Sequence, residues 1–106
     1  MAASLTEEEF SKHVNTKFRA RLDAEAEVDL ELAEVKGYRN KAIEQKGMER
    51  FSVYFKGPEA PRLPQKTYTL QHDQMGEFDI FLVPISPEQQ GCRYEAVFNY
   101  FRKSDE

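Results

Sequence analysis

The sequence contains a single cysteine and no apolar run long enough to cross a membrane. Cys92 alone cannot form a disulfide within the chain, which is typical of a protein from a reducing compartment. The longest apolar stretch, around Ile80 to Ile85, falls far short of the ~20 residues that a membrane helix needs, and the N-terminus lacks the basic and apolar segment of a secretory signal. We therefore expect a cytoplasmic protein with no membrane partner.

The chain also lacks an excess of positive charge. Its 15 basic and 19 acidic residues give a net charge of −4, which is the wrong sign for attraction to nucleic acid or to anionic lipid. Hydrophobic residues make up 40% and charged residues 32%, a balance that is typical of folded rather than disordered chains. A chain of 106 residues is long enough for one hydrophobic core, so residues 1–106 are predicted to form one domain.

The residue types of common catalytic and metal sites are few. Two histidines and one cysteine cannot form a zinc cage without carboxylates, and no glycine-rich loop of the phosphate-binding kind occurs. Cys92, His72 and Asp73 have the side chains of a thiol nucleophile, a base and an orienting acid, but their spacing is not diagnostic. We predict no catalytic, cofactor-binding or metal-binding residues and no cofactor, and the sequence identifies no reaction.

A short helix is predicted over residues 5–15. Thr6 and Glu9 have the spacing of an N-terminal capping box, and the acidic residues after Thr6 suit the positive end of a helix dipole. Phe10 and Val14 are four residues apart and would form an apolar stripe on one side of the helix. The acidic run at residues 7–9 is therefore interpreted as a helix start rather than a binding site.

From Lys17 onward the apolar period changes to two, which predicts a hairpin of two strands. Matching their apolar faces leaves Ala24 to Ala26 as the loop and gives the pairs Leu22–Val28, Ala20–Leu30 and Phe18–Leu32. On the outer face the same register gives the pairs Arg21–Asp29 and Arg19–Glu31. The acidic row over residues 25–31 is thus predicted to be a solvated strand face rather than a calcium site, because its carboxylates lie in a line instead of converging.

Four further strands are expected over Arg50–Lys56, Lys66–His72, Glu77–Pro84 and Arg93–Arg102. Between them lie a basic connection at 37–47, a proline-containing loop at 57–65, and turns at 73–76 and 87–91. The last two strands are apolar on both faces, so we predict that they form the centre of the sheet, with the second face covered by the helix or by an oligomer contact.

This pattern predicts a mainly β fold: an antiparallel sandwich of six to seven strands or a small, partly open barrel, with one short N-terminal helix. The β domain would span residues 17–102, and residues 103–106 would form a tail. A barrel of fewer than about eight strands has an interior filled by side chains, so a lipid-carrying calyx is not expected.

Four stretches, together with the opening Leu5-Thr6 to Phe10, resemble the signature of a small bacterial domain family of unknown function. These stretches are Phe51–Pro58, Leu63–Tyr68, Gly76–Pro84 and Tyr94–Asn99. The resemblance covers nearly the whole chain and implies an all-β fold, with no established activity, ligand or catalytic residue. It also implies an association with phage-tail-like assemblies. The family often has a glycine before the first strand, where this chain has Asn15-Thr16.

Two functional hypotheses follow. The first is a non-enzymatic interaction or assembly module, a monomer or weak homo-oligomer that binds another protein through exposed aromatic residues, namely Tyr54, Tyr68, Tyr94 and Tyr100. The second is a small ligand-binding or enzymatic domain with a site between the 37–47 and 57–65 loops, because loops often carry function. A concave pocket containing His72 or Cys92 together with a buried carboxylate would favour the second hypothesis, and a smooth surface with an uncovered apolar strip would favour the first.

Overall fold

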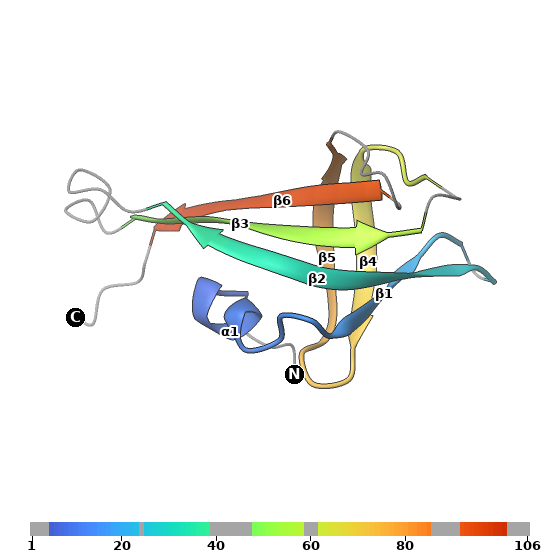
Figure 1. Ribbon diagram of the computed structural model, residues 1–106, viewed down its shortest axis with the longest axis horizontal. Coiled ribbons are helices and arrows are strands. Elements are labelled where there is room, and N and C mark those ends of the chain that lie inside the picture. The colour runs from blue at the N-terminus through green and yellow to red at the C-terminus, as the bar shows by residue number, and fades with distance from the viewer. Residues whose placement is uncertain (1–4, 24, 39–47, 59–61, 86–91, 102–106) are drawn as a thin grey trace.

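The computed structural model describes residues 5–23, 25–38, 48–58, 62–85 and 92–101, with the backbone alone at 48, 49 and 99–101. These residues form one helix and six strands: α1 (Glu7–Ser11), β1 (Lys17–Arg21), β2 (Glu27–Gly37), β3 (Met48–Gly57), β4 (Lys66–His72), β5 (Gly76–Pro84) and β6 (Cys92–Phe101). The strands form one antiparallel sheet that closes into a barrel in the order β1-β2-β3-β6-β5-β4 (Figure 1). The predicted mainly β fold is confirmed, and the barrel replaces the sandwich alternative. The predicted turn at 87–91, the tail at 103–106 and most of the 37–47 connection lie outside the described residues.

The β1–β2 hairpin has the predicted inward and outward faces but a different register. Ala20 is paired with Val28 and Phe18 with Leu30, so the predicted register was wrong by two residues. The cause is local, because the amide of Leu22 donates to the carbonyl oxygen of Ala26 at 2.8 Å and thereby sets a tighter connection than predicted. A shift of two residues keeps every side chain on its face, since the side-chain period of a strand is two.

The ion pairs of this hairpin therefore differ from those predicted. Arg19 lies 3.2 Å from Asp73, and Arg21 lies 3.1 Å from Glu77, so both arginines contact the β4–β5 hairpin rather than β2. On β2, Asp29 is 3.6 Å from Lys17 instead of being paired with Arg21. These exposed pairs contribute little to stability individually, but they line the joint between the two hairpins.

Helix α1 is shorter than predicted. The hydroxyl of Thr6 accepts a hydrogen bond from the amide of Glu9 at 3.0 Å, as the capping pattern predicted, but the helix ends at Ser11 rather than Asn15. Asn15 has a φ of 73°, a left-handed conformation that glycine and asparagine adopt most readily. Its amide then donates to Leu32 on β2 at 2.7 Å, so the chain has left the helix and joined the sheet.

Strand β2 belongs to both halves of the barrel. Residues Glu27–Glu31 pair with β1, whereas residues Glu31–Gly37 pair with β3, and the register shifts between Leu32 and Glu34. A bulge of this kind bends a strand and increases its twist. Figure 1 shows the result, in which β2, β3 and β6 run steeply across β4 and β5.

The seam between β5 and β6 is short among the described residues. These strands pair at Val83–Glu95 and Pro84–Tyr94, and the amide of Ile85 then donates to the carbonyl oxygen of Arg93 at 2.9 Å, while β6 pairs with β3 along its whole length. In a closed barrel every strand has a neighbour on both sides, so β5 and β6 do not form the centre of a sheet as predicted. Apolar side chains on both faces do not identify a central strand when the outer face stays open.

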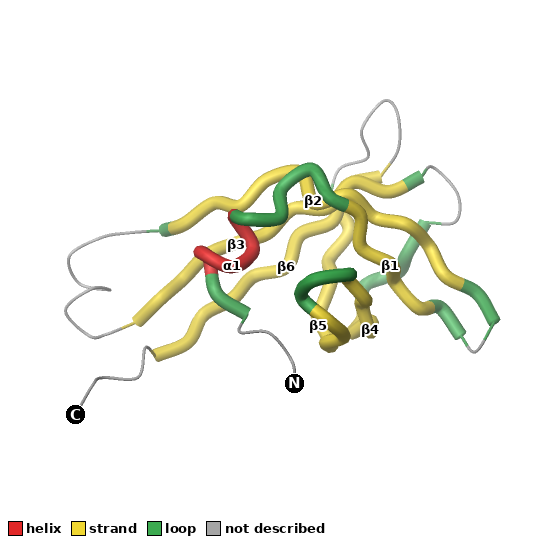
Figure 2. The backbone as a smooth tube through the Cα atoms, turned by 90° about the horizontal axis from the view of Figure 1, so that it is seen from below, coloured by secondary structure: helices red, strands yellow, loops and turns green. Residues whose placement is uncertain are grey.

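Side chains from α1 and from the segment before β4 close the barrel interior at its two ends. Phe10 is fully buried, and its ring lies 5.5–6.2 Å from the rings of Phe51, Phe78 and Phe98; Figure 2 shows α1 beside β3 and β6. At the other end Leu63 is buried, and its amide donates to the hydroxyl oxygen of Tyr94 at 2.9 Å. The helix thus packs on the core side. One alternative had predicted that the helix covers the second face of β5 or β6, and it does not.

Candidate interaction surface

The outer face of β2, β3 and β6 carries side chains in rows that run across the three strands. Lys36 is paired with Ser52, and Ser52 is paired with Val97, so these three side chains share one row. The next row contains Glu34, Tyr54 and Glu95. Because side chains alternate along a strand, this face is opposite to the one that builds the core.

A hydrogen-bonded chain of side chains crosses this face. The Ser52 hydroxyl donates to Glu95 Oε2 at 2.8 Å, and the Tyr54 hydroxyl donates to the same oxygen at 3.2 Å. The Tyr38 hydroxyl lies 3.2 Å from Ser52 Oγ, and since the Ser52 proton is directed at Glu95, Tyr38 is the donor. Ser52 is fully buried although it lies on the outer face, so its hydroxyl is not accessible as a nucleophile.

The two tyrosines respond in opposite directions to this network. The hydrogen bond with Tyr38, followed by burial and the charge of Glu95, raises the pKa of Tyr54 to about 12. Hydrogen bonds with Ser52 and then Tyr54 lower the pKa of Tyr38. The raised pKa keeps the Tyr54 hydroxyl neutral at pH 7, and its proton is donated to Glu95, which makes the network a structural support for the surface rather than a proton-transfer device.

Cations flank both rings. The guanidinium of Arg93 lies 4.9 Å from the centroid of the Tyr54 ring and 2.9 Å from Glu34 Oε1. Lys36 Nζ and the Arg50 guanidinium lie 6.0 and 5.9 Å from the centroid of the Tyr38 ring. Charge on this face is therefore mixed, with cations nearest to the aromatic rings.

An exposed apolar pair lies beside the network. Within the described part of the chain, Phe81 and Val97 are the only large hydrophobic residues that are exposed, at 48% and 55%. Phe81 lies two residues before Val83 on β5, and Val97 lies two residues after Glu95 on β6, so both are next to the Val83–Glu95 pair at which the described pairing of these strands ends. Val97 shares a row with Ser52, which makes the apolar pair continuous with the tyrosine network.

Only one of the four tyrosines predicted to form the interaction surface is placed there. Tyr54 lies on the outer face, but Tyr68 and Tyr94 are 2% and 1% exposed and line the core. Their hydroxyls hold the segment before β4, since Tyr68 donates to the carbonyl oxygen of Pro64 at 2.5 Å. Tyr100 is paired with Glu49 through the backbone, and its side chain lies outside the description.

Sequence reasoning missed Tyr38, Phe81 and Val97 as surface candidates. Tyr38 was assigned to the polar 37–47 connection, although its amide donates to the carbonyl oxygen of Arg50 and extends the β2–β3 ladder. The apolar second face of β5 and β6 was the available signal for the other two. We had interpreted this second face as covered, but Phe81 and Val97 are exposed on it.

A family model described as "Domain of unknown function (DUF6916)" matches residues 5–98. The chain belongs to this family. The match contains three of the four stretches that carried the resemblance and reaches Phe98 in the fourth, so the resemblance to a domain family of unknown function is confirmed. Comparisons with curated proteins and with solved structures found no significant match.

The DUF6916 domain does not bring Cys92, His72 and Asp73 together as a catalytic group. His72 Nδ1 accepts hydrogen bonds from the amides of Gln74 and Met75, each at 3.1 Å, so this nitrogen carries no proton. Asp73 is exposed and contacts Arg19. Cys92 is buried at the start of β6, opposite Gly57 on β3, where its thiol adjoins the Tyr94 hydroxyl.

His72 instead has a structural role beside α1. Its Nε2 lies 2.9 Å from Thr16 Oγ1, and the Thr16 proton is donated to the carbonyl oxygen of His13 at 2.6 Å, so Nε2 is the donor to Thr16. The His72 ring also contacts the rings of His13 and Phe18, with centroids 4.6 and 4.2 Å away. Burial and then the neighbouring His13 lower the pKa of His72, which keeps it neutral at pH 7.

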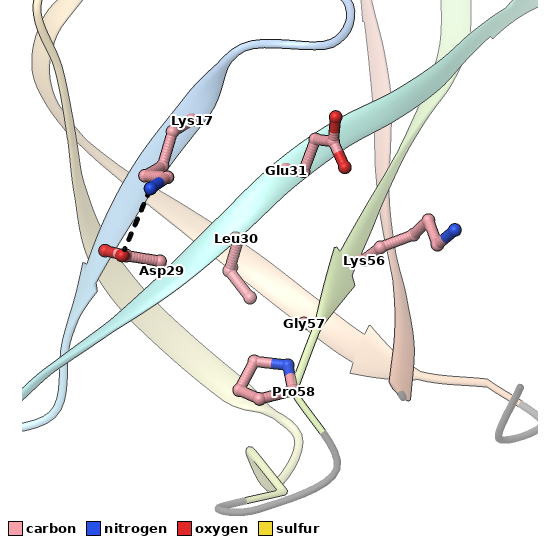
Figure 3. A pocket seen from close by; sticks show the side chains of 7 residues that line it. All are labelled: Lys17, Asp29, Leu30, Glu31, Lys56, Gly57 and Pro58. Carbon is pink, nitrogen blue, oxygen red and sulfur yellow. Dashed lines mark ion pairs between the residues drawn. The ribbon is translucent and has the colours of Figure 1, made fainter. Parts of the chain in front are cut away.

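Two hollows on the surface of this DUF6916 domain are candidate ligand sites. One of about 260 Å³ lies where β2 and β3 diverge and is lined by Lys17, Asp29, Leu30, Glu31, Lys56, Gly57 and Pro58 (Figure 3). Figure 3 shows Lys17 paired with Asp29, while Lys56 points away from that pair, so its charges do not converge on one point. The other, also about 260 Å³, lies beside His13 and His72. Both ring nitrogens of His72 are hydrogen-bonded, and His13 Nε2 lies 3.5 Å from Glu9 Oε2.

The alternative site between the 37–47 and 57–65 loops stays a prediction, because residues 39–47 and 59–61 lie outside the described residues. Tyr38 and Gly57 flank these loops, and they lie at opposite ends of β3, which spans Met48–Gly57. Across the residues described, no group of three or more His, Cys, Asp or Glu side chains is arranged to hold a metal ion. None of the described helical segments has the length and apolar character to cross a membrane.

Proposed function

We propose that this DUF6916 domain is a non-enzymatic protein-interaction or assembly module that binds another protein through the outer face of β3, β6 and β5. The observation that carries the proposal is the exposure of Phe81 on β5 and of Val97 on β6, the strand whose Glu95 is paired with Tyr54. Exposed apolar side chains next to aromatic ones are enriched at protein interfaces. The backbone beneath them belongs to the ladder of the barrel, so the surface is preformed and little conformational entropy is lost on binding.

The chemistry of the face supports binding rather than catalysis. Ser52, Tyr54 and Tyr38 donate their protons within the network, and Ser52 is closed to solvent. An accessible nucleophile with its own base is the minimum for covalent catalysis, and this surface holds none among the described residues. An assembly role of the phage-tail-like kind implied by the resemblance would use the same face, in a cytoplasmic protein that is a monomer or a weak homo-oligomer.

Capture of the partner from the native cell lysate tests the proposal. The tagged wild-type domain is compared with a Phe81→Thr/Val97→Thr double variant, in which both positions carry a β-branched residue that suits a strand, and with Glu27→Gln as a control on a different part of the barrel. We expect one specific protein to be enriched by the wild type and the control and to be lost by the double variant. Enrichment of no protein, or equal enrichment by all three, would contradict the proposal, provided that circular dichroism shows all three folded.

A further inference from the structure

The cations beside Tyr38 suggest the chemistry of the partner. We propose that Lys36 and Arg50 form a carboxylate-binding subsite, and that the partner segment carries an acidic side chain next to the apolar side chains that cover Val97 and Phe81. This inference rests on the proposed interaction function and adds the feature that selects the partner. It concerns a segment of another protein, recognised by one acidic residue and its apolar neighbours.

Among the described residues, Lys36 and Arg50 share the absence of a carboxylate partner with Lys56 and Lys66. They differ from these two lysines in lying together beside one aromatic ring, that of Tyr38. Arg93, Arg19 and Arg21 each lie within 3.2 Å of a carboxylate oxygen. Lys36 and Arg50 have no carboxylate partner within the part of the chain that the structure describes, and both are exposed. Two cations on one ring that have no carboxylate partner among the described residues form a local positive charge, in a chain of net charge −4, that attracts a carboxylate.

The position of the two cations is set by Tyr38. The Tyr38 amide donates to the Arg50 carbonyl oxygen at 2.9 Å, and Lys36 precedes Tyr38 by two residues on the same face. The Tyr38 ring is held by its hydroxyl through Ser52 and Glu95. A ring that is fixed in this way orients both cations before a ligand arrives, which lowers the entropy lost on binding.

The distance from the cations to the apolar pair defines the shape of the ligand. Lys36, Ser52 and Val97 occupy one row across β2, β3 and β6, so Lys36 and Val97 are separated by two strand spacings, or about 10 Å. An extended segment that crosses the strands covers this span in roughly three residues. The expected ligand is therefore an extended segment in which an acidic residue lies about three positions from a large apolar residue.

The test uses peptides of defined composition as probes. A random peptide library displayed on phage is selected on the immobilised full-length domain, and the enriched peptides are synthesised and titrated by fluorescence anisotropy. We expect them to combine acidic and apolar residues and to bind the Lys36→Gln/Arg50→Gln variant about three- to thirtyfold more weakly than the wild type. Lys66→Gln is the matched control, because Lys66 Nζ also stands over an aromatic ring, 5.4 Å from the centroid of Tyr68, but on β4.

Charge reversal provides the sharper measurement. The Lys36→Glu/Arg50→Glu variant should reject the selected peptides and accept analogues in which lysine replaces the acidic residue. Any one of three outcomes would overturn the inference. These are selected peptides without acidic residues, equal binding of the peptides by wild type and Lys36→Gln/Arg50→Gln, and no enrichment of peptides above background. Loss of binding in Phe81→Thr/Val97→Thr with no effect of the cations would leave the proposed surface standing and remove only its acidic preference.

A second copy of the chain is the competing occupant, because the outer face of β2 carries the acidic residues Glu27, Asp29 and Glu31. Sedimentation equilibrium of the wild type and of Lys36→Gln/Arg50→Gln, without peptide, distinguishes the two. The inference requires both proteins to sediment as monomers over the same concentration range. A wild-type dimer that dissociates in the variant would overturn it in favour of self-association.

Discussion

Nε2 of His72 lies 2.9 Å from the hydroxyl oxygen of Thr16, and this contact ties the turn between β4 and β5 to the segment that enters β1. The same ring accepts the amides of Gln74 and Met75 on its other nitrogen. One neutral imidazole therefore joins two stretches that are 56 residues apart in the sequence. A protonated ring would have no acceptor for those two amides.

The stability of the domain should therefore decrease in mild acid. Burial and then His13 lower the pKa of His72 in the folded chain, whereas the unfolded chain has the ordinary pKa of about 6.5. The unfolded state then binds the proton more readily, so the contribution of neutral His72 is complete above about pH 6.5 and is lost as the pH falls below that value. Urea unfolding between about pH 7 and about pH 5 measures the slope. His72→Gln should be less stable at pH 7 but show a smaller slope, and an unchanged slope would contradict the assignment.

Asn15 should tolerate glycine but not alanine. Its φ of 73° is unfavourable for a residue with a β-carbon, and asparagine accepts it better than alanine does. We expect Asn15→Ala to lower the free energy of unfolding by about 1 kcal/mol relative to Asn15→Gly. Chemical denaturation of the two variants provides the comparison, each serving as the control for the other. Equal stabilities would mean that the backbone at this position relaxes.

Phe10 should account for most of the attachment of α1 to the barrel. It is fully buried against three other phenylalanine rings, and it is the one buried residue of this helix. Phe10→Ala should lower the free energy of unfolding by about 3–5 kcal/mol, as other phenylalanine truncations in cores do. Ser11→Ala, at an exposed position of the same helix, should change it little. A loss below about 1 kcal/mol for Phe10→Ala would show that the helix contributes little to the core.

Removal of the Tyr38 hydroxyl should lower the pKa of Tyr54. The hydrogen bond with Tyr38 is the first cause of the raised pKa of about 12, so Tyr38→Phe should bring it toward the ordinary value of about 10. Phenolate absorbance after rapid mixing with alkaline buffer reports the titration before the chain unfolds. Tyr54→Phe identifies the step that belongs to Tyr54. If that step keeps its position in Tyr38→Phe, burial and Glu95 dominate instead.

The strands and their faces could be predicted because apolar alternation is a local signal. Phe18 and Ala20 on β1, and Phe51, Val53 and Phe55 on β3, are fully buried as the pattern indicated. The register of the β1–β2 hairpin could not be predicted in the same way, since a shift of two residues satisfies the same pattern. It depends on the Leu22–Ala26 hydrogen bond, which is a property of the connection rather than of the faces.

The candidate surface was less predictable because it depends on which strands meet. Tyr68 and Tyr94 have the same residue type as Tyr54, and only the closure of the barrel decides that they face inward. The end of α1 is likewise set from outside the helix, by the bonds of Asn15 and Thr16 to Leu32 on β2. Tyr38 lies at the start of the polar 37–47 connection, whose basic residues predicted an exposed loop rather than part of the sheet.

The short seam between β5 and β6 gives the barrel a place to open. Rupture of the Val83–Glu95 and Pro84–Tyr94 pairs and of the Ile85–Arg93 hydrogen bond would convert the barrel into an open sheet with β5 and β6 as its two edges, while every other ladder stays intact. Such a local opening has a lower free energy than global unfolding, so the amides along this seam should exchange with deuterium before those between β3 and β6. Phe81 and Val97 lie next to this seam. A partner bound across both side chains would hold β5 and β6 together and would slow the amide exchange.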